Sequence, residues 1–153
     1  MLVVAHPTIS KVNNINFELG EIININILEE FIKSNPNAKA LYITHNETST
    51  GVQNDLKSIS FLAKKYSLLY VVDGISSVAS VPCNTDELEI DVLISASQKG
   101  WVAPPGLAFM SISKKAWEFH CNSSSPKYYF DISQYKKYLE KLWTSGKAPW
   151  KTW

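Results

Sequence analysis

Apolar residues follow two alternating patterns along the chain, one with helical spacing and one in short continuous runs. The helical spacing over residues 26–34 predicts a helix, which the Asn-Pro-Asn at 35–37 ends. Residues 55–66 repeat the spacing and predict a second amphipathic helix. Between and after these helices, four apolar runs rich in strand formers predict β-strands at 40–44, 68–72, 91–96 and 107–112.

The order of these segments indicates the fold class. We expect helix, strand, helix, strand, short helix, strand, strand and helix, an alternation typical of an α/β fold with a mostly parallel sheet flanked by helices. The run Leu-Leu-Tyr-Val-Val at 68–72 has no polar position, as expected of a strand buried on both faces.

The C-terminal part has a different character. Residues 128–143 predict an aromatic-rich amphipathic helix, and Trp150 and Trp153 follow close to the end. Four of the five tryptophans lie beyond residue 116, so we expect their rings to need a partner surface that this chain does not contain.

Composition narrows the class of function. A chain of 153 residues with 45% hydrophobic content suits one domain with a core. Fifteen basic and fourteen acidic residues nearly balance, which argues against nucleic acid or an anionic membrane as a partner. All fifteen basic residues are lysine, so the chain lacks arginine, the preferred bidentate partner of carboxylates and phosphates.

Cysteine and histidine usage predicts neither a disulfide framework nor a metal site. Cys83 and Cys121 are too few for the former, and the three histidines are scattered. The chain shows no apolar run of membrane-spanning length and no signal-peptide pattern at its start. We therefore expect no membrane partner and an intracellular location, cytoplasmic or organellar (peroxisomal or mitochondrial) and not secreted.

Polar clusters follow three of the predicted strands: HNETSTG at 45–51, DGISS at 73–77 and SQKG at 97–100. Ligands of open α/β sheets bind beyond the carboxyl ends of the strands, where these clusters would meet. Asp73 and Lys99 at this edge allow two interpretations, a partly buried salt bridge or an amine nucleophile beside a carboxylate that holds a cationic ring nitrogen. Several hydroxyls could also take phenolate or phosphate oxygens there, although most of them individually fit strand-end caps: Thr48, Ser49, Thr50, Ser76, Ser77, Ser95 and Ser97.

Three segments in this order and spacing, HNETSTG, VVDGISSVAS and SASQKGWVAPPGLAFMSIS, resemble class V (fold type I) aminotransferases that depend on pyridoxal phosphate. The most similar branch is that of the serine–pyruvate, alanine–glyoxylate and serine–glyoxylate aminotransferases, and the resemblance runs from about residue 17 to the end. Cysteine desulfurases of the same class typically have a His-Lys pair at the position where this chain has Gln98-Lys99. This difference favours a resemblance to the aminotransferases.

The resemblance implies a role for each matching residue. Lys99 would form the Schiff base with the cofactor and move the proton, and Asp73 would pair with the pyridinium nitrogen. Ile75 would pack under the ring, Thr48 would contact the 3-oxygen, and Gln98 would reach the phosphate.

Three more residues complete the loop that would shape the pocket. These are His45, Glu47 and Gly51, of which His45 fits equally a strand-end histidine with satisfied hydrogen bonds.

The chain differs from the family in the regions that it contains, and this affects the activity that we expect. We expect residues 1–153 to be the central part of the large pyridoxal-phosphate domain, with the N-terminal phosphate-loop region and the C-terminal small domain absent. The family is homodimeric and acts on small amino acids and 2-oxo acids. The resemblance implies transamination of serine or alanine with glyoxylate or pyruvate as acceptor, impaired in the isolated chain. The alternative is a non-catalytic remnant acting as a fold or partner-binding module.

Overall fold

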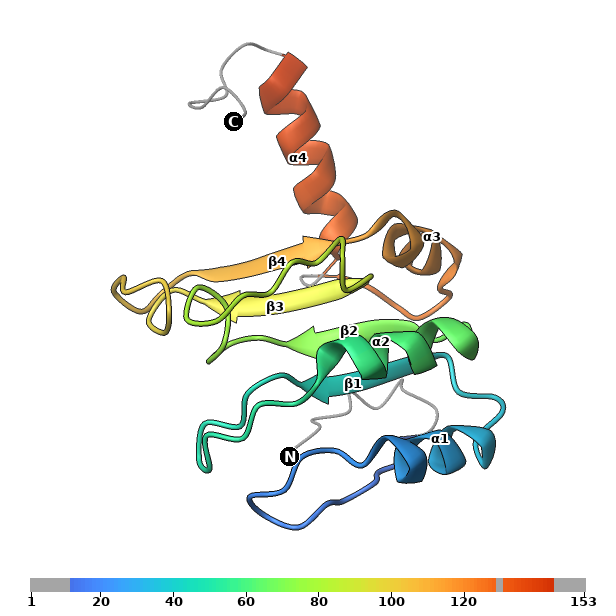
Figure 1. Cartoon of the computed structure of the whole chain (residues 1–153). Coiled ribbons are helices and arrows are strands. Elements are labelled where there is room, and N and C mark those ends of the chain that lie inside the picture. Colours follow the sequence, from blue (N-terminus) through green and yellow to red (C-terminus); the bar gives the residue numbers. More distant parts are fainter. Residues whose placement is uncertain (1–11, 129–130, 145–153) are drawn as a thin grey trace. The chain divides into compact units, whose positions relative to one another are not determined.

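The computed structural model describes residues 12–128 and 131–144, which fall in two units. The larger unit, Asn13–Ser123, holds a four-stranded sheet and three helices (Figure 1). Its strands are β1 (Ala40–Thr44), β2 (Leu69–Asp73), β3 (Val92–Ala96) and β4 (Ala108–Ile112), and its helices are α1 (Ile25–Lys33), α2 (Leu56–Lys65) and α3 (Lys114–Asn122).

The sheet has the order β1-β2-β3-β4, with β1, β2 and β3 parallel and β4 antiparallel to β3. Thr44 lies opposite Asp73, and Asp73 lies opposite Ile94, so the carboxyl ends of the parallel strands share one edge. This arrangement confirms the predicted α/β class with a mostly parallel sheet flanked by helices.

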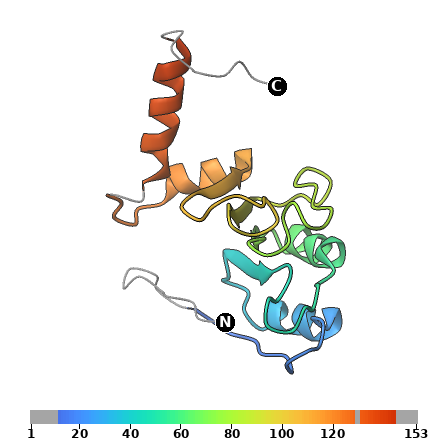
Figure 2. The ribbon, with the colours of Figure 1, turned by 90° about the vertical axis from the view of Figure 1, so that its left-hand side faces the viewer.

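Helices α1 and α2 lie on the same side of the sheet, as the two views in Figures 1 and 2 show. Each begins at a side chain that caps its free amides: Asn24 accepts hydrogen bonds from two backbone N–H groups of α1, and Asp55 does the same for α2. Their apolar faces meet the sheet in one core, whose buried members are Leu28, Ile32, Ile43, Leu56, Ile59, Leu62, Ala63, Leu68, Tyr70, Val72, Ile90 and Leu93.

Strand β2 is the most deeply buried strand of the sheet. Tyr70, Val71 and Val72 are at most 6% exposed, which confirms the interpretation of the uninterrupted apolar run. The Tyr70 hydroxyl donates to the backbone oxygen of Leu56 at 3.3 Å, and burial raises the pKa of Tyr70 well above its usual value. Removing this apolar surface from water is the main stabilisation of the unit.

The expected short helix between β2 and β3 is wrong, because hydrogen-bonded turns occupy this stretch. Val78 N–H donates to Gly74 and Val81 N–H to Ser77, as in a helical turn. Ala79, however, has a φ of +66°, which leaves the right-handed helical path, and the following Pro82 has no N–H to continue it.

The second unit contains one described helix, α4 (Ile132–Thr144), which confirms the predicted tail helix over this range. Tyr135, Tyr138 and Leu139 on α4 are each more than half exposed. Trp150 and Trp153 lie outside the described residues. None of the helices in the described part of the chain combines the length and apolarity needed to cross a membrane.

Candidate functional site

Three loops leave the carboxyl edge of the sheet, and we call them the first (45–54), second (73–81) and third (97–107) edge loops. Sheet pairing continues into them: the His45 N–H donates to the Asp73 oxygen at 2.9 Å, and the Gly74 N–H donates to the Ile94 oxygen at 2.9 Å. The three polar clusters of the sequence therefore do meet at one edge.

Asp73 is the last residue of β2, and its carboxylate is exposed. Its Oδ1 accepts a hydrogen bond from the Ile75 N–H at 2.9 Å, which fixes the side chain over the start of the second edge loop. Within residues 12–128 and 131–144 the other carboxylate oxygen, Oδ2, accepts no hydrogen bond, so it can receive one from a ligand.

Lys99 is exposed in the third edge loop, one turn beyond β3. Its ammonium forms none of the ion pairs found among the described residues, so the salt-bridge interpretation of Asp73 and Lys99 is wrong. The backbone of Lys99 is held on both sides: its N–H donates to Ala96 at 3.4 Å, and its oxygen accepts from Val102 at 3.0 Å. The amine itself is available for chemistry.

Ser97 organises the third edge loop from a fully buried position. Its hydroxyl donates to the Pro104 oxygen at 2.7 Å and accepts from the Leu107 N–H at 3.3 Å. Its backbone N–H donates to Leu107, and its oxygen accepts from Ala103. Four hydrogen bonds on one residue close the loop that carries Lys99.

Trp101 braces the same loop against the sheet. Its indole N–H donates to the Ser95 hydroxyl at 3.0 Å, and its ring centroid lies 5.0 Å from that of Phe109 on β4. The next residue, Val102, has a φ of +53°, a left-handed conformation that is strained for a β-branched side chain. The braced surroundings hold this strain.

Gly100 fixes the third loop against the second. A Cβ at Gly100 would collide with the Val78 oxygen and lie 2.5 Å from the Ser80 hydroxyl and 2.8 Å from the Ser80 nitrogen. The residue after Lys99 must therefore be glycine for these two backbones to approach so closely.

Three of the strand-end hydroxyls bond within the protein, as the cap interpretation predicts. Ser95 accepts from Trp101, Ser97 bonds within its own loop, and Ser76 exchanges hydrogen bonds with Asn46. Ser77, by contrast, is 1% exposed, and its hydroxyl finds no partner among the described residues. The hydroxyls are thus mostly caps, as strand-end serines often are.

The first edge loop is a small hairpin with Thr48 at its exposed tip. The Glu47 N–H donates to Val52 at 2.8 Å, and the Gly51 N–H donates to Glu47 at 2.8 Å, with Gly51 at a φ of +73° that favours glycine. Ser49 donates through its backbone N–H and its hydroxyl to the Glu47 carboxylate, which lowers the pKa of Glu47. Glu47 and Gly51 thus shape the loop.

His45 connects the first loop to β2 and is only 3% exposed. Its ring nitrogen Nδ1 has no hydrogen-bond partner among the described residues, so the interpretation of a fully satisfied histidine is wrong. Burial lowers the pKa of His45, which keeps the imidazole neutral. A buried polar atom without a partner is unusual in a folded protein and indicates a site where a ligand or water completes the bonding.

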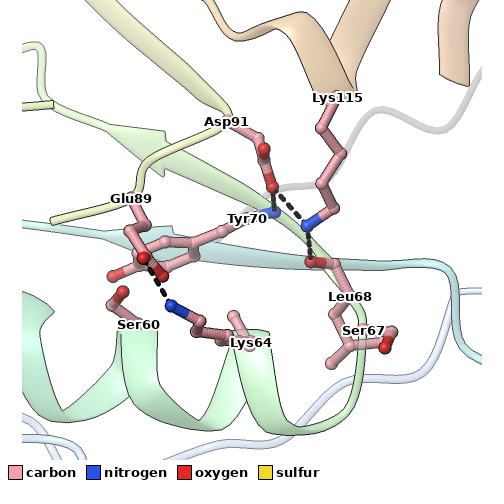
Figure 3. A pocket seen from close by; sticks show the side chains of 9 residues that line it. Ser60, Lys64, Ser67, Leu68, Tyr70, Glu89, Asp91 and Lys115 are labelled. Atoms are coloured by element: carbon pink, nitrogen blue, oxygen red, sulfur yellow. Dashed lines mark hydrogen bonds and ion pairs between the residues drawn. The ribbon is translucent and has the colours of Figure 1, made fainter. Parts of the chain in front are cut away.

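A cavity of about 350 Å³ lies at the other end of the strands (Figure 3). There the Lys115 ammonium lies 2.7 Å from both Asp91 Oδ2 and the Leu68 oxygen, and the Tyr70 N–H donates to Asp91 at 2.8 Å. The carboxylate of the nearly buried Asp91 thus joins β2, β3 and α3. We interpret this cluster as a structural tie, since it lies at the amino ends of the strands, away from Lys99. Sequence reasoning missed it, because a lone Asp before a strand carries no signal of its partners.

Comparison with known proteins identifies the family to which the chain is similar. Residues 4–138 match the model of the family described as Aminotransferase class-V. The chain is 38% identical over 128 residues to an uncharacterized aminotransferase of Methanocaldococcus jannaschii, covering 83% of this chain and 33% of that protein. It is 35% identical over 133 residues to the serine–glyoxylate aminotransferase of Arabidopsis thaliana, covering 84% and 33%.

A solved structure shows the same fold. The alanine–glyoxylate aminotransferase of Nostoc sp. superposes with a TM-score of 0.75 at 26% identity, over 90% of this chain and 36% of that one. The chain thus spans about a third of the length of the curated relatives that it matches.

Proposed function

The chain belongs to the class V aminotransferase family, and from this premise we propose that it serves pyridoxal-phosphate-dependent transamination of a small amino acid. The observation that carries the proposal is the presence, at one sheet edge, of a lysine amine and a carboxylate oxygen that have no partner among the described residues. A lysine amine can form a Schiff base with the aldehyde of the cofactor, and a carboxylate can hold its protonated ring nitrogen.

The described residues fit the ring side of the cofactor. Asp73 would hold the protonated ring nitrogen through its free oxygen, and Thr48 would donate to the 3-oxygen from the hairpin tip. Ile75 would pack under the ring, and Gln98, exposed next to Lys99, would reach the phosphate. The Lys99 amine would hold the cofactor covalently.

Pyridoxal phosphate, when bound, supplies an electron sink for the bonds at the substrate Cα. The chain's own residues supply proton control. Asp73 would favour a proton on the ring nitrogen, because an opposite charge favours the cationic form. The Lys99 amine would be the base that takes up and gives back the substrate Cα proton. The braced third loop orients this amine, so little motion of its backbone is needed.

Serine or alanine is the proposed amino donor, with glyoxylate or pyruvate as acceptor. The serine–glyoxylate activity of the Arabidopsis thaliana relative supports this choice. The 153 residues hold no arginine to grip a substrate carboxylate bidentately. We therefore propose that the chain is the central part of the large domain, and that alone it turns over poorly. We also propose that the protein acts as a homodimer and is located in the cytoplasm or in an organelle.

Cofactor capture tests this function. The chain is incubated with pyridoxal phosphate and reduced with borohydride, and the modified residue is identified by peptide mass spectrometry. We expect a single stable adduct on Lys99, weakened in Asp73→Asn. Labelling spread evenly over the surface lysines, such as Lys57 and Lys136, would contradict the proposal. A transamination assay with serine and glyoxylate then measures turnover.

A second candidate is the non-catalytic, partner-binding remnant, which one surface favours. Leu107 before β4 and Phe109 and Met110 within it are 64%, 38% and 52% exposed, on an uncharged edge strand. Such edges pair readily with another strand. If this function holds, the chain binds no cofactor, and Met110→Lys lowers its self-association in sedimentation velocity.

A further inference from the structure

Two asparagines anchor the first edge loop, one on each leg of its hairpin. On the return leg, the Asn54 side chain donates to the Thr44 oxygen at 2.9 Å and accepts from the Ile23 N–H at 3.0 Å. On the outgoing leg, Asn46 turns toward a different part of the molecule, the second edge loop. The hairpin tip between them is exposed, so these anchors decide where Thr48 lies.

Asn46 and Ser76 form a closed pair of hydrogen bonds. Asn46 Nδ2 donates to the Ser76 hydroxyl at 3.1 Å, and that hydroxyl donates to the Asn46 backbone oxygen at 2.7 Å. Both residues are partly buried, so water competes less for these groups than at the surface. We call this pair the Asn46–Ser76 clasp.

The clasp acts next to the carboxylate of the site. Ser76 directly follows Ile75, whose N–H holds Asp73 Oδ1 at 2.9 Å. A displacement of Ser76 must therefore pass to the Ile75 amide and so to the orientation of Asp73. On the other side of the clasp, Asn46 lies two residues before Thr48 in the first edge loop.

We infer that Asn46 is a positioning residue that couples the Thr48 loop to the Asp73 loop through Ser76. The inference rests on the proposed function for its purpose, since only there do Thr48 and Asp73 bind one ligand. The coupling itself is a property of the chain without ligand. The backbone hydrogen bond from the His45 N–H to the Asp73 oxygen joins the two loops at their bases, and the clasp adds a second link beyond the strand ends.

Amide hydrogen exchange of the ligand-free chain tests the coupling. Asn46→Ala should speed exchange about tenfold at Glu47 in the first loop and at Ile75 in the second, because both lose a shared anchor. Ser76→Ala removes both hydrogen bonds of the clasp, whereas Asn46→Ala keeps the bond to its backbone oxygen, so Ser76→Ala should speed exchange at the same two amides at least as much. The double variant should add little to Ser76→Ala. Ser76→Thr keeps the hydroxyl, so the amides of Glu47 and Ile75 should exchange at the wild-type rate in this variant.

Asn54→Ala is the matched control, because it frees the same hairpin without touching the clasp. It should speed exchange in the first loop and leave Ile75 unchanged. If the Ile75 amide exchanges at the same rate in Asn46→Ala as in wild type, this result would overturn the inference. So would equal acceleration at the core of β2, since Asn46 would then support the whole fold rather than two loops.

Cofactor binding supplies a separate arm. If wild type binds pyridoxal phosphate, Asn46→Ala should weaken its apparent affinity about tenfold with Lys99 still the labelled residue. Unchanged affinity would contradict the positioning role. Absence of cofactor binding by wild type would reject the proposed function, while the exchange experiment would still decide the coupling.

Discussion

Gly100 offers the sharpest structural test of the site, because it is the residue that lets the Lys99 loop meet the second edge loop. In Gly100→Ala the new methyl group would meet the Val78 oxygen and the Ser80 nitrogen and hydroxyl. Two of these three atoms belong to the backbone and cannot rotate away. The third loop must therefore shift as a whole, and Lys99 with it.

The size of the effect follows from two opposing contributions. Overpacking a close contact costs about 1–3 kcal/mol, while alanine restricts the unfolded chain and returns about 0.4–1 kcal/mol. We expect the free energy of unfolding to fall by about 1–2 kcal/mol. With a urea dependence of about 2 kcal/mol per molar, the unfolding midpoint should drop by roughly 0.5–1 M.

The assay is urea unfolding followed by circular dichroism, with cofactor capture on the folded fraction. Ser80→Ala is the control, since it removes one colliding atom and should be nearly neutral alone. It should also fail to rescue Gly100→Ala, because the backbone atoms remain. Full rescue, or a Gly100→Ala midpoint equal to wild type with unchanged capture on Lys99, would refute the close packing of the two loops.

Three other perturbations have expected outcomes. Asp91→Ala should lower the free energy of unfolding by about 2–4 kcal/mol, since it removes the carboxylate that pairs with Lys115 and accepts from the buried Tyr70 N–H, whereas Lys64→Met at an exposed ion pair should cost under about 1 kcal/mol in the same urea titration. Burial lowers the pKa of His45, so below the usual histidine pKa of about 6.5 the unfolded state binds more protons than the folded state. The free energy of unfolding should therefore fall as the pH drops through this window, and His45→Gln should remove that part of the pH dependence. Ser97→Ala should speed proteolytic cleavage within the third edge loop, and unchanged cleavage would show that its hydroxyl does not close the loop.

The fold could be predicted largely from the sequence because its signals are local. The uninterrupted apolar run of β2 and the helical spacing of α1 and α2 each specify one element without knowledge of the rest. The predicted short helix failed for a reason that is not local. Ala79 takes a left-handed conformation, and its neighbours Val78 and Ser80 pack against Gly100, a contact between distant segments that no local pattern reveals.

The site was predictable in position but not in its internal bonding. Parallel strands bring Asp73 and Lys99 to one edge whatever their side chains do, so the alternation of elements sufficed. Which hydroxyls are free depends on partners far along the chain: Ser76 is bound by Asn46, and Ser95 by Trp101. No pattern of spacing reveals such pairs, nor the unpartnered Nδ1 of His45.

Site-specific capture is the direct test of whether the Lys99 amine binds the cofactor, as the proposed aminotransferase function requires. Wild type and Lys99→Ala are each saturated with pyridoxal phosphate, reduced with borohydride and mapped by mass spectrometry. We expect one dominant adduct on Lys99 in wild type and its loss in the variant, with the visible absorbance of the bound cofactor lost in parallel. Equal total labelling of the two proteins, with no preference for Lys99, would contradict this expectation.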